Sequence, residues 1–136
     1  MKLLQQQKFI SRYEEVEKVE VFLNKLQDEL KFDNEFYAML MLVVSEAVTN
    51  GIVHGNKLDE SKSVFLKAFL DEKNHELIFE SQDEGEGFKP ELVPDPLAEE
   101  NLLKASGRGV YLMKEYANDV QYKDGGTTIR ITFSLS

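Results

Sequence analysis

The chain has 136 residues, of which 42% are hydrophobic, and it carries a formal net charge of -9. That length suits a single core and is too short for two ordinary domains, so we expect residues 1–136 to form one domain. Binding to a phosphate backbone depends mainly on clustered Lys and Arg, and the acidic balance therefore argues against a nucleic-acid partner. The absence of cysteine excludes disulfides and thiolate metal sites, and two well-separated histidines argue against a zinc cluster.

No stretch of the sequence indicates a membrane segment. The amino terminus has one lysine and a pair of leucines before polar glutamines, which is too little apolar length for a signal peptide. The longest apolar run, 38–44, is far shorter than the roughly 20 residues that a membrane-spanning helix needs. We therefore expect a cytoplasmic protein without a membrane partner.

Apolar periodicity predicts the first elements of the chain. Residues 5–11 are expected as a strand, and apolar side chains at steps of three and four predict an amphipathic helix over 13–30. The charged side of this helix is most simply a solvated surface, and a partner-helix role stays open. Asp33 is suited to cap a second helix, apolar on nearly every side, which should end near Gly55.

Three polar residues stand at helical spacing in the second helix. Glu46, Asn50 and His54 are each four residues apart, which places them along one face about a turn from one another. Burying such groups against hydrocarbon without polar partners would cost roughly 2–7 kcal/mol each. The stripe therefore indicates either a ligand cavity or a solvated helix end, and this helix alone leaves both interpretations open.

A glycine motif follows the second of two strands that we predict as a hairpin, 63–71 and 76–82. It consists of Asp83, Gly85 and Gly87. Two glycines at a strand end let the backbone take positive φ and approach a ligand, and Asp83 offers an acceptor at the pocket edge. An ordinary glycine turn would explain the same pattern. A dinucleotide fingerprint fits poorly, and no P-loop occurs.

The next segment, 89–106, contains all three prolines and predicts a long loop, either a lid or a disordered insertion. Gly107, Arg108 and Gly109 then lead into a predicted helix. Glycines at a helix amino terminus favour anions, because free backbone N–H groups and the helix dipole attract phosphate, and Arg108 adds charge. A serine cap followed by flexible glycines is the plain alternative.

The chain finishes with strands 119–123 and 128–135, which an Asp-Gly-Gly turn joins into a hairpin. As an ordered set, segments 46–56, 83–88 and 106–113 resemble the N, G1 and G2 boxes of the ATPase fold shared by gyrase, a heat-shock chaperone, mismatch-repair proteins and histidine kinases. The short lid and the phrase ENLLKASGRG are most similar to the bacterial anti-sigma-factor serine/threonine kinases. The resemblance runs from the first helix to the last strand.

The resemblance implies a role for each matched residue. Asn50 would give its side-chain oxygen to Mg²⁺, and Glu46 would be the general base that activates the attacking hydroxyl. Asp83 would accept a hydrogen bond from the adenine amino group. The other implied nucleotide-binding residues are Gly85, Gly87, Gly107, Arg108, Gly109 and Thr127. His54 is expected to be structural or to lie at the pocket rim.

On this resemblance we expect a kinase that uses ATP, yields ADP and requires Mg²⁺. It would phosphorylate a serine or threonine on an anti-sigma-factor antagonist and sequester a sigma factor, and a homodimer is left open. The alternative is a nucleotide-gated protein-binding module with little or no kinase activity. A plain structural domain is disfavoured by three ordered boxes, and a histidine autokinase by the lack of a preceding phosphoacceptor helix.

The element order and the resemblance together predict the architecture. We expect an α/β (α+β) two-layer sandwich with the histidine-kinase-like ATPase (Bergerat) fold. It should have a mixed sheet of about five strands, covered on one face by the helices that begin near Tyr13, Asp33 and Gly109.

Overall fold

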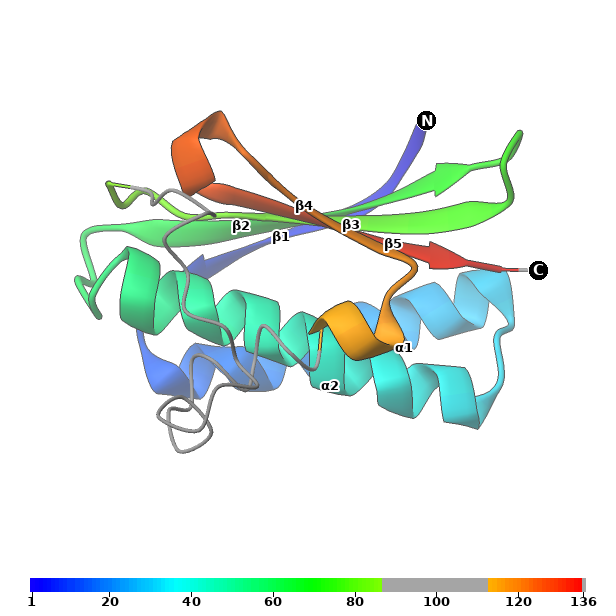
Figure 1. Ribbon diagram of the computed structural model, residues 1–136. Coiled ribbons are helices and arrows are strands. Elements are labelled where there is room, and N and C mark those ends of the chain that lie inside the picture. Colours follow the sequence, from blue (N-terminus) through cyan, green and yellow to red (C-terminus); the bar gives the residue numbers. More distant parts are fainter. Residues whose placement is uncertain (87–112, 136) are drawn as a thin grey trace.

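The computed structural model describes residues 1–86 and 113–135, which form a layer of strands and a layer of helices (Figure 1). The strands are β1 (Lys2–Ile10), β2 (Ser63–Asp71), β3 (Glu76–Gln82), β4 (Asp119–Lys123) and β5 (Thr128–Ser134). The long helices are α1 (Lys18–Leu30) and α2 (Asn34–Asn50). Short helical turns are η1 (Tyr13–Glu17), η2 (Gly51–Gly55) and η5 (Asp124–Gly126), and 113–116 is also helical.

Most predicted elements are confirmed, with differences at the start of the chain. The two hairpins formed by β2 with β3 and by β4 with β5 lie where the sequence predicted them. The first strand is longer than expected and begins at Lys2, while the helix predicted from Tyr13 starts as the 3₁₀ turn η1 and becomes α-helical only at Lys18. The Glu15 carboxylate turns back to accept a hydrogen bond from the Ile10 N–H at 2.9 Å, which ties this turn to the end of β1.

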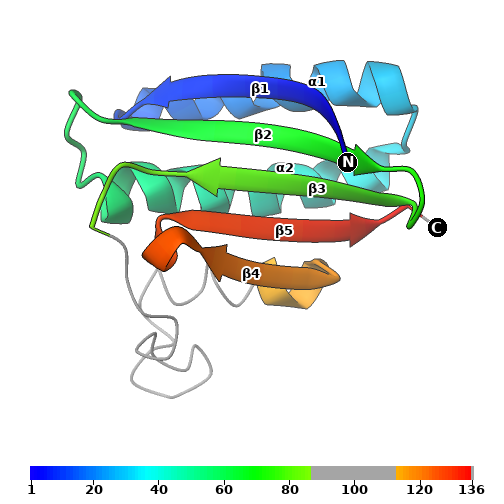
Figure 2. The ribbon, with the colours of Figure 1, turned by 90° about the horizontal axis from the view of Figure 1, so that it is seen from above.

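The strand order is β1-β2-β3-β5-β4, and all four neighbouring pairs are antiparallel (Figure 2). The prediction of a mixed sheet is therefore wrong for the strands that the structure describes. β3 and β4 run in the same direction, because each is antiparallel to β5, but β5 lies between them and they never pair. Two antiparallel helices, rather than one crossover helix, connect β1 to β2, and β2 therefore returns antiparallel to β1.

The helices cover one face of the sheet, as predicted (Figures 1 and 2). α1 and α2 lie side by side there, and the described end of the last predicted helix, 113–116, lies on the same face. Met113 is fully buried in the core cluster that joins the helices to the sheet. The expected first residues of that helix, near Gly109, lie outside the described residues.

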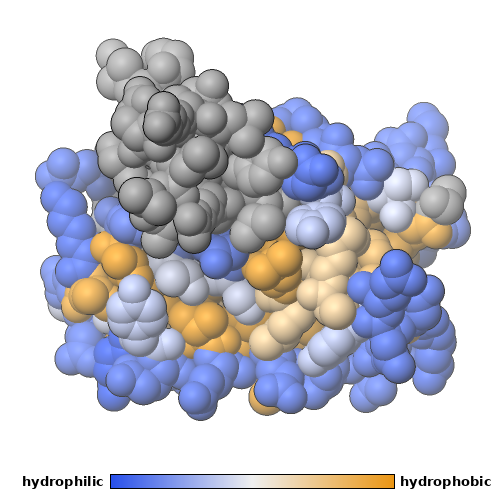
Figure 3. All heavy atoms as spheres, turned by 60° about the horizontal axis from the view of Figure 1, so that its bottom comes forward, coloured by the Kyte–Doolittle hydropathy of each residue, from blue (hydrophilic) through white to orange (hydrophobic). Residues whose placement is uncertain are grey.

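Helix α2 is the central helix of this layer, and Asp33 caps it, as predicted. The Asp33 carboxylate accepts a hydrogen bond from the Phe36 N–H at 2.8 Å. Within the described residues, 34–55 is the one helical stretch long and apolar enough to cross a membrane by length and composition. It packs as a core helix instead, burying Leu40, Val43, Val44, Ala47 and Val48. Figure 3 shows a band of apolar side chains across the helix face between charged margins, and Leu42 of α2 remains 39% exposed.

The core centres on an aromatic cluster between the sheet and the helices. Phe79 of β3 is 1% exposed and lies against Phe22 of α1 and Phe133 of β5, with ring centroids 6.5 and 5.9 Å away. Phe36 of α2 stacks edge-on against Phe133, which extends the cluster along the second helix. By contrast, Phe65 of β2 points to the open face of the sheet and is 36% exposed. The two faces of the sheet therefore differ in how much stability a phenylalanine contributes.

We predict that Phe79→Ala lowers the free energy of unfolding by about 3–5 kcal/mol, because it removes a fully buried ring and leaves a cavity. The matched control Phe65→Ala, on the open face, should lower it by about 1 kcal/mol. Urea unfolding followed by circular dichroism measures both values. Equal losses in the two variants would contradict the assignment of the core to the helix side of the sheet.

Candidate functional site

The last turns of α2 carry the polar stripe that the sequence predicted. Glu46 and Asn50 are half-buried, and no hydrogen bond from another described residue reaches either side chain. The helix then widens into the π-helical turn η2, in which the Asn56 N–H donates to the Gly51 carbonyl at 2.8 Å. His54 lies within this turn, and its side chain is exposed.

The electrostatics of Glu46 follow from its position at the edge of the core. Burial raises the pKa of its carboxyl, and the nearby His54 opposes this by favouring the charged form. A half-buried carboxylate that no described residue hydrogen-bonds costs free energy, so its presence at the end of a core helix points to a use other than stability.

Asp83 lies at the end of β3, directly beside η2. Its carboxylate Oδ1 accepts a hydrogen bond from the Gly85 N–H at 2.8 Å, while its Oδ2 accepts none within the described residues. Burial raises the pKa of this carboxyl, and the Gly85 N–H and the charge of Lys62 counteract part of that effect. Asp83 is thus held through one carboxylate oxygen, and no described residue donates to the other.

The closing hairpin meets this loop through a backbone contact. The Asp83 N–H donates to the Thr127 carbonyl at 2.9 Å, so residues that are far apart in sequence lie side by side. The Thr127 hydroxyl donates to the carbonyl of Asp124 at 3.0 Å, within the turn η5. The structure therefore brings Thr127 and Asp83, two residues that the sequence singled out separately, to the same place.

Glycines allow η2 and the Asp83 loop to approach each other closely. A Cβ on Gly55 would overlap the Asp83 carboxylate, and a Cβ on Gly85 would overlap the Gly55 carbonyl. A Cβ on Gly51 would lie 2.9 Å from Val64 Cγ2, below the closest distance at which real Cβ atoms pack. Gly85 is therefore required by the contact between two segments of the chain itself.

Three residues of this site were not predicted from the sequence: Gly55, Asn56 and Glu84. Asn56 is buried and bonds to three separate segments, and the Glu84 carboxylate accepts from the Ser63 N–H at 2.6 Å. Asn56 was only the last residue of the first box, 46–56, and Glu84 stood between Asp83 and Gly85 with no predicted role. Their partners lie up to 45 residues away, so no local pattern could have identified them.

Part of the predicted site lies outside the described residues. The predicted lid, 89–106, is in this part of the chain, and so are Gly87, Gly107, Arg108 and Gly109. Of the predicted residues that the structure describes, it brings together Asp83, Gly85 and Thr127, while Glu46 and Asn50 lie in the last turns of α2, which precede η2.

Known proteins resemble this chain over most of its length. A sequence model of the histidine kinase-like ATPase domain matches residues 9–133. The chain is 36% identical to the anti-sigma F factor of Bacillus subtilis (strain 168) over 99 residues, which are 69% of this chain and 66% of that protein. It is 37% identical to the anti-sigma F factor of Clostridium perfringens (strain 13 / Type A) over 91 residues, which are 63% of this chain and 64% of that protein.

The chain thus spans a little under two thirds of the length of these curated relatives. The match to the domain model covers more of this chain, since it runs from the end of β1 to the end of β5. It also agrees with the two-layer architecture and with a polar site between α2 and the end of β3. The chain belongs to the family of histidine kinase-like ATPase domains.

Proposed function

We propose that this domain is an anti-sigma regulatory kinase of the cytoplasm. It binds ATP with Mg²⁺, transfers a phosphoryl group to a serine or threonine of an antagonist protein, and sequesters a sigma factor. The observation that carries the proposal is the packing of the end of α2 and of η2 against Asp83, whose second carboxylate oxygen accepts no hydrogen bond from a described residue. Similarity to proteins named anti-sigma F factor supports the choice of partners.

The nucleotide base is assigned to Asp83. An amino group such as that of adenine donates hydrogen bonds, and the Asp83 oxygen that accepts none from the described residues supplies the matching acceptor. Thr127 lies next to it through the backbone and would pack under the base. Gly85 lets the loop come close to η2, and Gly87 is proposed to give the ribose similar access.

The metal is assigned to Asn50. The described residues contain no group of three or more carboxylates and histidines that could hold a metal by itself. Mg²⁺ commonly keeps waters and takes one or two protein ligands together with phosphate oxygens, so a single amide oxygen beside a triphosphate is a sufficient protein contribution. The phosphates themselves are assigned to Gly107, Arg108 and Gly109, which lie outside the described part of the chain.

The general base is assigned to Glu46, one turn before Asn50. As the substrate hydroxyl attacks the γ-phosphorus, Glu46 takes its proton, the bond to the β-phosphate oxygen breaks, and ADP leaves. Burial raises the pKa of Glu46 and makes it a stronger base than an exposed glutamate. If transfer is slow or absent, the same site would serve the second candidate function, a nucleotide-gated protein-binding module.

We predict that Asp83→Asn weakens Mg-ADP binding by about tenfold or more, because it replaces one acceptor oxygen with a donor. Asn50→Ala should weaken nucleotide binding only when Mg²⁺ is present, because it removes the metal ligand. Titration calorimetry with Mg²⁺ and with a chelator measures both effects, and Asp71→Asn, in the β2–β3 turn, is the control. Unchanged affinity in both site variants would remove the proposed site.

The same Asp83→Asn variant should separate binding from stability. Because the folded-state pKa of Asp83 is raised above its ordinary value of 3.8, the native state holds this proton more tightly than the unfolded chain does. Stability therefore falls as the pH rises through the window between 3.8 and the raised value. Asp83→Asn should abolish that fall and be at least as stable as the unmodified protein near neutral pH.

Asp71→Asn should change the pH dependence of stability in the opposite direction. Hydrogen bonds from Asn74 lower the pKa of Asp71, so its contribution is present above 3.8 and is lost as the pH falls through the lowered value. Urea unfolding of both variants between about pH 2 and about pH 8 makes the comparison. A clear loss of stability in Asp83→Asn at neutral pH would show that the carboxylate is structural.

We predict that Glu46→Gln leaves ATP affinity nearly unchanged and lowers phosphoryl transfer by about 10²-fold or more. Glutamine keeps the size of the side chain and cannot take the proton. Glu35→Gln, in the first turn of the same helix, should transfer normally. Transfer of labelled phosphate to candidate antagonists is the measurement. Normal transfer by Glu46→Gln would reject the base, and no transfer by the unmodified protein would favour the nucleotide-gated module.

A further inference from the structure

Asn56 directly follows η2 and is the most completely bonded polar side chain near the site. It is 1% exposed. Its Nδ2 donates to the Ser11 hydroxyl and to the Ser63 carbonyl, both at 3.0 Å, and its Oδ1 accepts from the Glu84 N–H at 2.8 Å. Both ends of the amide are therefore used, and its three partners come from the end of β1, the start of β2 and the loop after β3.

Two of these bonds belong to a closed ring of hydrogen bonds that holds Glu84, the residue directly after Asp83. The Asn56 amide binds the Ser63 carbonyl, the Ser63 N–H donates to the Glu84 carboxylate at 2.6 Å, and the Glu84 N–H returns to Asn56. Glu84 is thus held at its backbone and at its side chain. Because Asp83 precedes it and donates to the Thr127 carbonyl, the Asp83 backbone is fixed on both sides.

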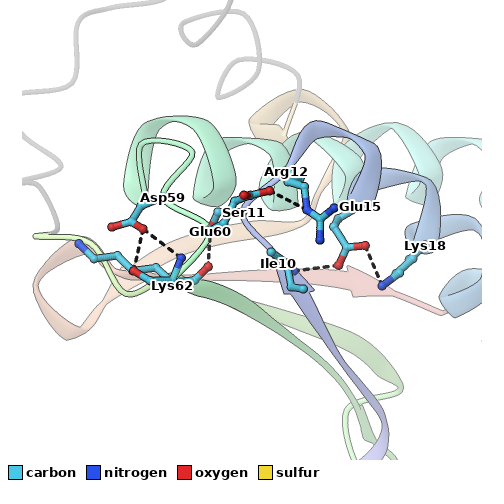
Figure 4. A network of polar contacts seen from close by, with 9 residues as sticks. Ile10, Ser11, Arg12, Glu15, Lys18, Asp59, Glu60 and Lys62 are labelled. Carbon is cyan, nitrogen blue, oxygen red and sulfur yellow. Dashed lines mark hydrogen bonds and ion pairs between the residues drawn. The ribbon is translucent and has the colours of Figure 1, made fainter.

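The third bond connects the ring to the first strand. Ser11 is buried, and its hydroxyl donates to the Lys62 carbonyl at 2.7 Å (Figure 4). The same hydroxyl accepts from the Asn56 amide. Next to it, Arg12 forms an exposed ion pair with Glu60 at 2.8 Å. The segment between η2 and β2 is therefore fastened to the end of β1. Asn56 is held there through its Nδ2, whereas its Oδ1 binds Glu84.

We propose that Asn56 is a positioning residue for nucleobase selection, an inference that rests on the proposed nucleotide site. By holding Glu84, it keeps the Asp83 carboxylate at the end of η2, where Gly55 leaves space for it. Adenine presents an amino donor where guanine presents a carbonyl acceptor, so a fixed carboxylate accepts from adenine and repels guanine. A loosened loop loses this discrimination, because the carboxylate then has no single position.

The test compares Asn56→Ala with Asn74→Ala, each of which removes a side-chain amide. Asn74 lies in the β2–β3 turn, and among the described residues its amide donates only to Asp71, at 2.9 Å. Titration calorimetry with Mg-ADP and Mg-GDP is done below the unfolding temperature of each protein. Asn56→Ala should weaken ADP binding by about tenfold and reduce the preference for ADP over GDP. Asn74→Ala should change neither.

A second variant covers the case in which Asn56→Ala does not fold. Glu84→Ala removes only the Ser63 contact and leaves the Asn56 bonds in place, so it should weaken ADP binding by about threefold with a smaller loss of preference. A purely structural role would lower the unfolding temperature and leave the ratio of ADP to GDP affinity unchanged in folded protein.

The outcomes separate the two proposals. If the unmodified protein binds neither nucleotide, the proposed function fails and this inference fails with it. If the unmodified protein prefers ADP and a folded Asn56→Ala or Glu84→Ala keeps the full preference, the nucleotide site stands and the positioning role is overturned.

Discussion

The close backbone contact between Gly55 and Gly85 is the constraint on which the site depends. Without side chains at these two positions, the turn η2 can lie directly against the loop after β3. That contact places Gly51, directly after α2, and Gly55, at the end of η2, against Asp83. A Cβ at Gly85 would meet the Gly55 carbonyl and a Cβ at Gly55 would meet the Asp83 carboxylate, so both the backbone contact and the position of Asp83 depend on these glycines.

The partly buried carboxylates differ in whether a cation binds them, and this difference separates carboxylates that serve the fold from those that do not. Glu80, on the open face of the sheet, is partly buried, yet Lys123 and Arg130 bind it at 3.1 and 2.8 Å and leave its pKa below the ordinary value. Burial instead raises the pKa of Glu46 and Asp83, which have no such cation bound to them in the described residues. Carboxylates whose burial is not compensated by a bound cation are typical of a functional site.

The architecture explains how distant segments reach this place. β5 lies between β3 and β4, which brings the turn before β5 next to the end of β3 and thus Thr127 next to Asp83. α2 runs beneath the centre of the sheet, and its apolar sides require burial, so its polar last turns must emerge at the edge where β3 ends. The hydrogen-bond ring of Asn56 then fastens the loop to the first and second strands.

Local patterns in the sequence determined the hairpins, the cap at Asp33, the amphipathic α1 and the apolar α2, because strand alternation, turn residues and helical periodicity act over a few neighbours. The ordered boxes also indicated the family and the candidate residues Glu46, Asn50 and Asp83. Only the tertiary structure decided that the sheet is antiparallel throughout its described strands, and only it assigned Gly55, Asn56 and Glu84 to the site. The insertion of β5 between β3 and β4 and the buried side-chain hydrogen bonds join residues that are far apart in the chain. Local periodicity does not indicate such contacts.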